Sequence, residues 1–197
     1  MDRPRGPRFS VFVFLASVAF LHGGVSHAGA QGKMKTKTEV AVLGGGCFWG
    51  VEDLIRKLPG VLSTEVGYSG GVTADPRYED VKTGATGHVE VVQIQFDPQK
   101  LAFRDLLRYF FRLHDPTTLN RQGNDRGTQY RSVIFTHSAE QREVAIAVKE
   151  EVNRSGKWKN PVVTAVEDAG PFYSAEAYHQ DYLVKNPGGY TCHFIRD

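Results

Sequence analysis

The sequence predicts an α+β protein: a two-layer α/β sandwich with a ferredoxin-like βαββαβ core, long loops and an irregular C-terminal tail. Three observations predict it. Segments with strand-like and helix-like patterns follow one another in the order strand, helix, strand, strand, helix, strand. The 197 residues are 41% hydrophobic and 23% charged, which is an ordinary globular balance for one domain. From Ala169 the chain becomes aromatic and rich in Gly and Pro, so no regular element is expected there.

The first half of the core begins with a short apolar strand, residues 39–44. Residues 47–58 are expected to form a helix that ends at Pro59-Gly60, because one face carries only apolar residues: Phe48, Val51, Leu54, Ile55 and Leu58. Residues 61–68 and 88–96 read as the second and third strands. The Gly- and Thr-rich connection between them is too long for a simple turn.

The second half opens at Asp97-Pro98, which we expect to begin a helix. Its apolar side carries Leu101, Phe103, Leu106, Leu107, Phe110 and Phe111. A long polar loop leads to a strand over residues 130–135. Ser138 with Gln141 predicts a capping box for a helix over residues 139–153, and a last strand follows at 162–168. This helix and strand are additions to the βαββαβ core.

The first 30 residues are expected to be a signal peptide that is cleaved. Three arginines precede an apolar run over residues 9–21, and Ala28 and Ala30 are spaced like a cleavage signal. Such runs span about 7–15 residues in signal peptides, whereas a membrane-spanning helix needs ~20. We therefore expect residues 31–38 to be a linker, residues 39–197 to form a single domain, and the protein to be periplasmic or secreted. The alternative is an uncleaved leader that anchors the protein in the membrane.

The charge balance and the histidines exclude some classes of function. A formal net charge of +2 gives no electrostatic reason to bind nucleic acid. His88 and Glu90 lie two residues apart, but neither a Cys pair nor a second His at helical spacing accompanies them, so no metal site is expected. We also expect no cofactor and a monomer.

Cys47 is one of only two cysteines, and it follows three glycines at the start of a predicted helix. Free N–H groups and the helix dipole at that position favour a thiolate. Phe48 belongs to the apolar face of the helix, whereas Trp49 does not. Aromatic rings beside a reactive thiol could enclose an apolar group such as a thioether methyl. From position alone, a buried structural cysteine or half of a disulfide with Cys192 remains open.

Glu90 is the second residue with a chemical signature. In the third strand it shares one face with Val92, Ile94 and Phe96, which is the better candidate for the core face. Burial there would raise the pKa of the carboxyl group and favour the protonated acid. The alternative is an exposed glutamate where the strand begins.

Six motifs together carry a resemblance to a known family: GGGCFWGVE, VGYSGG, YEDVKTGATGHVEVV, DPTTLNRQGNDRGTQYRS, AEAYHQDYL and NPGGYTCHF. In this order they resemble class A peptide methionine sulfoxide reductase (the MsrA family), over residues 40–194. None of the motifs is specific alone. The resemblance implies the same α/β sandwich, and an enzyme that repairs oxidative damage by reducing methionine S-sulfoxide, in proteins or as the free amino acid.

The resemblance also implies roles for individual residues. Cys47 would be the nucleophile that attacks the sulfoxide sulfur, and Phe48 and Trp49 would surround the substrate's S-methyl group. Glu90 would be the protonated acid that delivers a proton to the sulfoxide oxygen.

Four further residues are implied by the same resemblance. Tyr78 and Tyr130 would donate hydrogen bonds to the sulfoxide oxygen, and Asp125 would help to orient the substrate site. Cys192, in a tail that has to swing towards Cys47, would condense with the sulfenic acid of Cys47 to form a disulfide. A thioredoxin-like protein would then reduce this disulfide.

Two other classes of function fit part of the pattern. A secreted binding module could use a Cys47–Cys192 disulfide as a staple and its aromatic residues as a ligand pocket. A thiol peroxidase could use the same two cysteines. A peroxidase, however, has no evident need for a methyl-binding cage or for an acid placed like Glu90.

Overall fold

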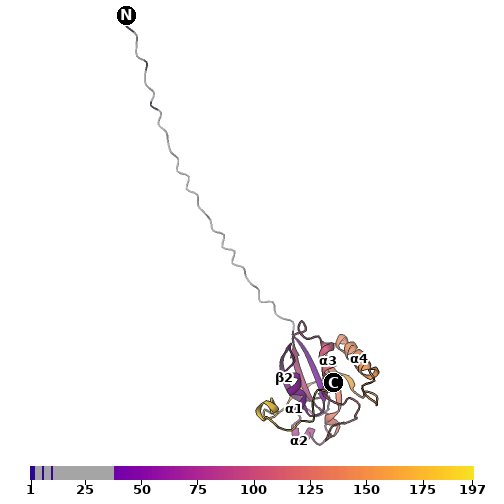
Figure 1. Ribbon diagram of the computed structural model, residues 1–197. Coiled ribbons are helices and arrows are strands. Elements are labelled where there is room, and N and C mark those ends of the chain that lie inside the picture. The colour runs from indigo at the N-terminus through magenta and orange to yellow at the C-terminus, as the bar shows by residue number, and fades with distance from the viewer. Residues whose placement is uncertain (3–5, 7–9, 11–37) are drawn as a thin grey trace. The chain divides into compact units, whose positions relative to one another are not determined.

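The computed structural model describes residues 1–2, 6, 10 and 38–197, so the predicted leader and linker lie almost wholly outside the described residues. The chain divides into two units, Met1–Met34 and Lys35–Asp197. Every helix and strand that the structure describes belongs to the second unit (Figure 1).

One six-stranded sheet forms the centre of this unit, in the order β7-β6-β1-β3-β2-β8. The strands are β1 (Glu39–Gly45), β2 (Val61–Ser69), β3 (Val89–Phe96), β6 (Ser132–Thr136), β7 (Ala165–Asp168) and β8 (Phe172–Ser174). Within the four central strands, β6-β1-β3-β2, each pair of adjacent strands is antiparallel. Together with α1 and α3 they are the predicted ferredoxin-like core, which is confirmed. β7 extends the sheet parallel to β6, and β8 extends the other edge antiparallel to β2.

Three longer helices accompany the sheet: α1 (Phe48–Ile55), α3 (Phe103–Leu113) and α4 (Ala139–Arg154). Short elements occupy the segments predicted to be loop or irregular tail: α2 (Tyr78–Val81), the hairpin β4–β5 (Arg121–Gln122 and Asp125–Arg126), the 3₁₀ turn η1 (Thr128–Tyr130) and α5 (Tyr182–Lys185). These loops are therefore locally ordered, and they supply much of the site described below.

The second core helix begins later than the sequence predicted. Asp97 and Pro98 do not open α3, because the Asp97 side chain accepts a hydrogen bond from Gln99 N (3.0 Å) and holds a separate turn. Leu101 N closes that turn on Asp97 O at 2.9 Å, and α3 starts only at Phe103. The capping of α4 also differs in detail. Ser138 Oγ accepts from Gln141 N as predicted, but the Gln141 side chain accepts from the N–H of the preceding residue, His137.

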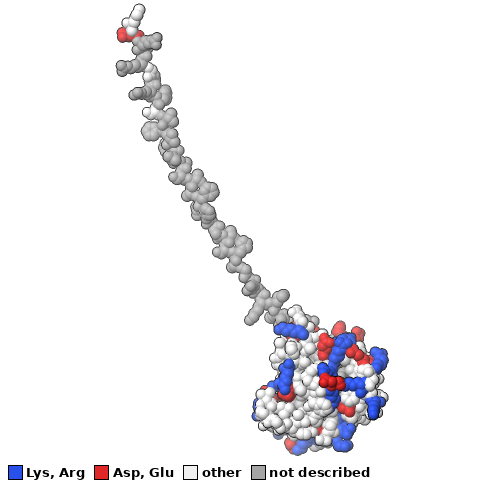
Figure 2. Space-filling model, viewed as in Figure 1, with Lys and Arg blue, Asp and Glu red and all other residues white. Residues whose placement is uncertain are grey.

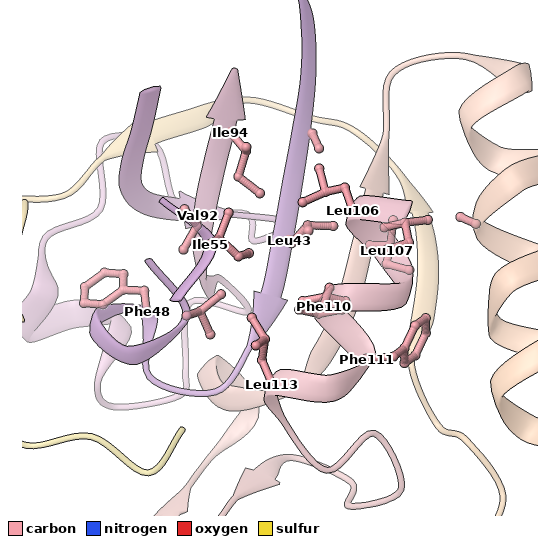
Figure 3. Close-up of a cluster of buried hydrophobic side chains, with 14 of the residues drawn as sticks. Leu43, Phe48, Ile55, Val92, Ile94, Leu106, Leu107, Phe110, Phe111 and Leu113 are labelled. Carbon is pink, nitrogen blue, oxygen red and sulfur yellow. The ribbon is translucent and has the colours of Figure 1, made fainter. Parts of the chain in front are cut away.

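The larger hydrophobic core lies between the sheet and the helices α1, α3 and α4. Figure 3 shows its centre, where side chains of α1 and α3 meet those of β1 and β3. Val92, Ile94 and Phe96 all belong to this core, whereas Val89 and Val91 belong to a smaller cluster on the opposite face. The two-residue alternation predicted for β3 is confirmed, and it turns Glu90 towards the same side as α1.

Charges are mixed on the face that Figure 2 displays, where Lys and Arg lie among Asp and Glu over α3 and α4. Arg108 on α3, for example, binds both carboxylate oxygens of Glu151 on α4 at 2.9 Å. A face of this kind creates no strong field of one sign. Among the residues that the structure describes, no helix is both long and apolar enough to span a membrane.

Candidate active site

The turn before α1 exposes Cys47 to the site in a backbone conformation that the preceding glycines permit. Gly46 has φ of +103°, a region that favours glycine, and a Cβ there would lie 2.6 Å from the Gln122 side chain. Cys47 itself is the N-cap residue of α1, one position before the predicted first turn, and is 7% exposed. The sulfur therefore sits at the N-terminal end of the helix, nearly shielded from water.

Glu90 connects this helix start to the sheet. Its Oε2 accepts a hydrogen bond from Phe48 N at 3.2 Å, and the residue is only 2% exposed. Burial raises the pKa of the carboxyl group to about 8, although the Phe48 N–H acts in the opposite direction and the Asp125 charge adds a little. The carboxyl group is thus mostly protonated at pH 7. The expectation of a buried glutamate with a raised pKa is confirmed.

The prediction that the helix start would favour a Cys47 thiolate is wrong for the resting site. Burial, and then the nearby Glu90 charge, raise the pKa of the Cys47 thiol well above its ordinary value. The Trp49 backbone N–H lowers it, but the effect is smaller. One helical N–H is already directed at Glu90, and the site is nearly dry, so desolvation outweighs the helix dipole. Cys47 is a thiol at rest, and it ionises more easily when Glu90 is protonated.

A cavity of about 150 Å³ lies in front of Cys47, and side chains from six separate segments line it. The lining residues are Cys47, Phe48, Trp49, Tyr78, Glu90, Asp125, Tyr130 and Tyr190. Every predicted site residue except Cys192 is among them. Tyr190 is the one lining residue that the sequence did not single out, although it lies two positions before Cys192.

The two predicted tyrosines approach the cavity from different segments. Tyr78 is the first residue of α2, and Tyr130 is the last residue of η1. Burial raises the pKa of Tyr78 to about 12, and burial raises the pKa of Tyr130 further, with Glu90 adding to both. Both hydroxyl groups therefore keep their protons at any physiological pH and can donate hydrogen bonds into the cavity.

Trp49 is held in place by the tail. Its Nε1–H donates to His179 Nδ1 at 3.0 Å, and its ring stacks on Tyr182 with 3.7 Å between ring centroids and 13° between planes. This explains why Trp49 lies outside the apolar stripe of α1. Phe48, by contrast, is 1% exposed and packs in the main core as well as lining the cavity.

Glu176 ties the same tail segment to Tyr78. One of its carboxylate oxygens accepts from Tyr78 N and the other from the Tyr68 hydroxyl group, both at 2.9 Å. Sequence reasoning missed Glu176, His179 and Tyr182. The signal is present in the motif AEAYHQDYL, but the resemblance implies no role for its individual polar and aromatic residues.

Asp125 links the cavity to the second cysteine. Its Oδ1 accepts from the Tyr190 hydroxyl group at 2.9 Å, and its Oδ2 lies 3.3 Å from Cys192 Sγ. Cys192 is partly buried and, like Cys47, is a free thiol. The fold therefore brings both cysteines to one site, and in this structure no disulfide joins them.

The tail is less free than the sequence suggested. After Cys192, His193 bonds Gly45 O at 2.8 Å, and Arg196 N donates to Arg112 O at 2.8 Å. The stretch between α5 and Cys192 contains Gly188, with φ of +82°. Any swing of Cys192 is therefore confined to this stretch unless the anchors beyond it break.

His88 has a structural role in this fold. Its Nδ1 accepts from Gly71 N at 3.1 Å, and its Nε2 donates to Thr73 O at 2.8 Å, which fixes the loop between β2 and α2. In the described part of the chain, no group of three or more His, Cys, Asp or Glu side chains is placed to hold a metal ion.

A thiol that must accept an oxygen atom needs a nearby acid to protonate that oxygen, and a second thiol to regenerate it. Cys47, Glu90 and Cys192 meet these needs within one site, which defines a cysteine-dependent oxidoreductase. The family model described as peptide methionine sulfoxide reductase matches residues 39–197. The chain belongs to this family and, by its relatives, to class A.

Two relatives align with this chain over nearly their whole length. Peptide methionine sulfoxide reductase MsrA of Methanothermobacter thermautotrophicus is 58% identical over 161 residues, covering 82% of this chain and 95% of that protein. MsrA 1 of Mesorhizobium japonicum is 55% identical over 163 residues, covering 83% of this chain and 92% of that protein.

Solved structures show the same fold. Reduced Mxr1 of Saccharomyces cerevisiae matches with a TM-score of 0.78 and 40% identity, over 83% of this chain and 94% of that one. An unusual oxidized form of Mxr1 matches less well, with a TM-score of 0.59, 40% identity, and 82% and 90% of the two chains covered. By TM-score, the fold of this chain is more similar to the reduced form of Mxr1 than to that oxidized form.

Proposed function

We propose that this protein is a thioredoxin-dependent peptide-methionine (S)-S-oxide reductase, in which Cys47 and Cys192 carry the chemistry. The observation that supports this most strongly is the hydrogen bond from Phe48 N to Glu90 Oε2, which holds a protonated acid at the same helix start as Cys47. Repair of oxidised methionine, in proteins or as the free amino acid, is the function that this site fits.

The first half of the reaction takes place in the cavity. The Cys47 sulfur attacks the sulfoxide sulfur, and Glu90 gives a proton to the sulfoxide oxygen. The oxygen moves to Cys47 as a sulfenic acid while methionine is released, and the proton of the Cys47 thiol replaces the one that Glu90 donated. A neutral Glu90 also removes a repulsive charge from the ionising thiol.

The remaining cavity residues bind and orient the substrate. Phe48 and Trp49 surround the S-methyl group, because aromatic rings make favourable contacts with such groups. Tyr78 and Tyr130 donate hydrogen bonds to the sulfoxide oxygen as negative charge develops on it. Asp125 orients the substrate through its loop. The preference for the S epimer at sulfur is an implication of the family.

The second half regenerates Cys47. Cys192 condenses with the sulfenic acid, water leaves, and a Cys47–Cys192 disulfide results. A thioredoxin-like protein then reduces the disulfide by thiol exchange. A structure of Mxr1 in complex with Trx2 supports this choice of reductant: it has 30% identity and a TM-score of 0.57, with 83% of this chain and 93% of that one covered.

Replacing Cys192 by serine is expected to separate the two halves. The variant should convert about one methionine sulfoxide per enzyme molecule and then stop, because the sulfenic acid of Cys47 has no partner thiol. Rapid mixing without reductant measures the methionine formed, and a steady-state assay with thioredoxin measures turnover. A peroxidase or a binding module would give no such stoichiometric methionine. Full turnover of Cys192→Ser with thioredoxin would contradict the role of Cys192.

We also propose export. Support comes from the sequence of residues 1–30 alone, with its arginines, apolar run and A-x-A spacing. The prediction is a mature protein that begins at Gln31, in the periplasm or outside the cell. Expression of the full chain with its leader in a bacterial host, followed by intact-mass determination of the purified protein, checks it. A protein that keeps residues 1–30 and sediments with membranes would instead support the uncleaved anchor.

A further inference from the structure

His193 directly follows Cys192, and its ring contacts both the Cys192 sulfur and the turn that carries Cys47. Nε2 is 2.8 Å from Gly45 O, two residues before Cys47, and Nδ1 is 3.6 Å from Cys192 Sγ. The ring packs so closely on α1 that a Cβ at Gly50 would lie 2.6 Å from Nδ1. His193 is only 6% exposed, so its surroundings fix both its position and its contacts.

The contact with Gly45 determines which nitrogen carries the proton. A carbonyl oxygen can only accept, so Nε2 must be the protonated nitrogen. Burial lowers the pKa of His193, which is therefore neutral near pH 7. A neutral imidazole with Nε2 protonated has its lone pair on Nδ1. The nitrogen that faces the Cys192 sulfur is thus a free acceptor.

Cys192 needs such an acceptor. Burial, and then the hydrogen bond and charge of Asp125, raise the pKa of its thiol to about 12, so Cys192 holds its proton until it reacts. Asp125 Oδ2 is also close to the sulfur, at 3.3 Å. An imidazole is in general the stronger base of the two groups, however, and the Asp125 charge favours a protonated His193.

We propose that His193 is the general base of the disulfide-forming step. Its Nδ1 takes the proton of Cys192 as the Cys192 sulfur attacks the sulfenic sulfur of Cys47. The S–S bond forms while the S–O bond of Cys47 breaks, and the leaving hydroxyl group takes a proton from Glu90 and departs as water. His193 and Glu90 then return to their starting states by proton exchange with solvent, so no further oxidant or reductant is required.

The hydrogen bond to Gly45 O keeps the His193 ring close to Cys47. Because Nε2 is bound to the turn that carries Cys47, the ring stays beside that turn while residues 186–192 adjust. The inference rests on the proposed function, in which Cys192 condenses with the Cys47 sulfenic acid.

The test is a single-turnover experiment with His193→Gln. The glutamine amide can still donate to Gly45 O, but it offers no base to Cys192. Reduced enzyme is mixed with excess L-methionine S-sulfoxide without reductant and quenched at intervals, and both methionine and the Cys47–Cys192 disulfide are measured. Methionine should form at the wild-type rate, whereas disulfide formation should slow by about 10²–10⁴-fold, the usual contribution of a general base. His193→Asn, with the same expected result, serves if the glutamine variant folds poorly.

Thr191→Val is the matched control. Thr191 Oγ1 accepts from His193 N at 3.1 Å, so this variant disturbs the same tail but leaves the imidazole in place. It should form the disulfide at nearly the wild-type rate.

A pH profile separates base catalysis from support of the tail. The charged or titratable groups around the ring are Cys192, Asp125, Arg196 and His114. In His193→Gln the residual disulfide rate should rise about tenfold per pH unit through the neutral range, because hydroxide must replace the base. Wild type should show no such rise above the pKa of His193.

Three results would count against these assignments, each in a different way. If His193→Gln forms the disulfide at the wild-type rate, the base role is wrong. Equal slowing of methionine and disulfide formation would also overturn it, because His193 would then act on Cys47 through the glycine turn. If wild type itself releases methionine but forms no Cys47–Cys192 disulfide, the proposed role of Cys192 fails instead.

Discussion

Replacing Cys47 by serine is expected to abolish methionine formation even in a single turnover. A serine hydroxyl group is a far weaker nucleophile than a thiol, and its oxygen cannot accept the sulfoxide oxygen as a thiol sulfur does when it becomes a sulfenic acid. The loss should be on the order of 10⁴-fold or more, as for other enzymes without their nucleophile. Quenched mixing of Cys47→Ser with one equivalent of methionine S-sulfoxide measures the methionine released.

The structure predicts that serine at position 47 will not disturb the fold. Cys47 is the N-cap residue of α1, and it makes no side-chain capping hydrogen bond. Serine is among the preferred N-cap residues, so Cys47→Ser should unfold at a temperature no lower than wild type. The reductase function would be ruled out if the folded variant kept full activity.

Replacing Glu90 by glutamine should have the second-largest effect. The amide oxygen can still accept from Phe48 N, so the helix start is retained, but no proton can be delivered to the sulfoxide oxygen. Oxygen transfer should slow by about 10²–10⁴-fold, with little change in substrate binding. Single-turnover rates at increasing substrate concentration separate the two effects, and a normal maximal rate would remove Glu90 from the acid role.

The pH dependence gives an independent check on Glu90. Because burial raises the pKa of Glu90 to about 8, the acid keeps its proton at neutral pH and loses it as the pH rises through about 8. The single-turnover rate of wild type should therefore fall above that pH, and Glu90→Gln should lack this fall. Without a Glu90-dependent decline, the general acid would have to be another group.

Glu52→Gln is the matched control for Glu90→Gln. Glu52 is also buried, at 1% exposed, and it lies on α1, but it binds Arg56 and Thr64 and does not line the cavity. Its loss should reduce stability, because a partly buried Arg56 loses a carboxylate. Below its unfolding temperature, oxygen transfer should be close to normal.

Patterns with a short period were sufficient to predict the core. The two-residue alternation in β3 correctly placed Val92, Ile94 and Phe96 in the main core and Glu90 beside them. The predicted boundaries of the elements were less accurate. They depend on local hydrogen bonds that compete with helix formation, such as the one that the Asp97 side chain accepts from Gln99 N. The short elements α2 and η1 carry no periodic signal, since each is a single turn.

The cavity shows where sequence reasoning stops. Motif resemblance named seven of its eight lining residues and missed Tyr190. It gave no role to His179 or Tyr182, because their importance lies in contacts with Trp49 across 130 and 133 residues of sequence. Only the folded chain brings these segments together.

The sequence by itself determined the order of the elements, the core faces, the family, and the residue types that the chemistry requires. Tertiary structure alone decided the ionisation of those residues. Burial, and the competition for the first N–H groups of α1, set the protons on Cys47 and Glu90, and desolvation overrode the helix dipole that the sequence suggested. The reason is physical: a pKa depends on distance, charge and exclusion of water, and none of these is defined until the chain has folded.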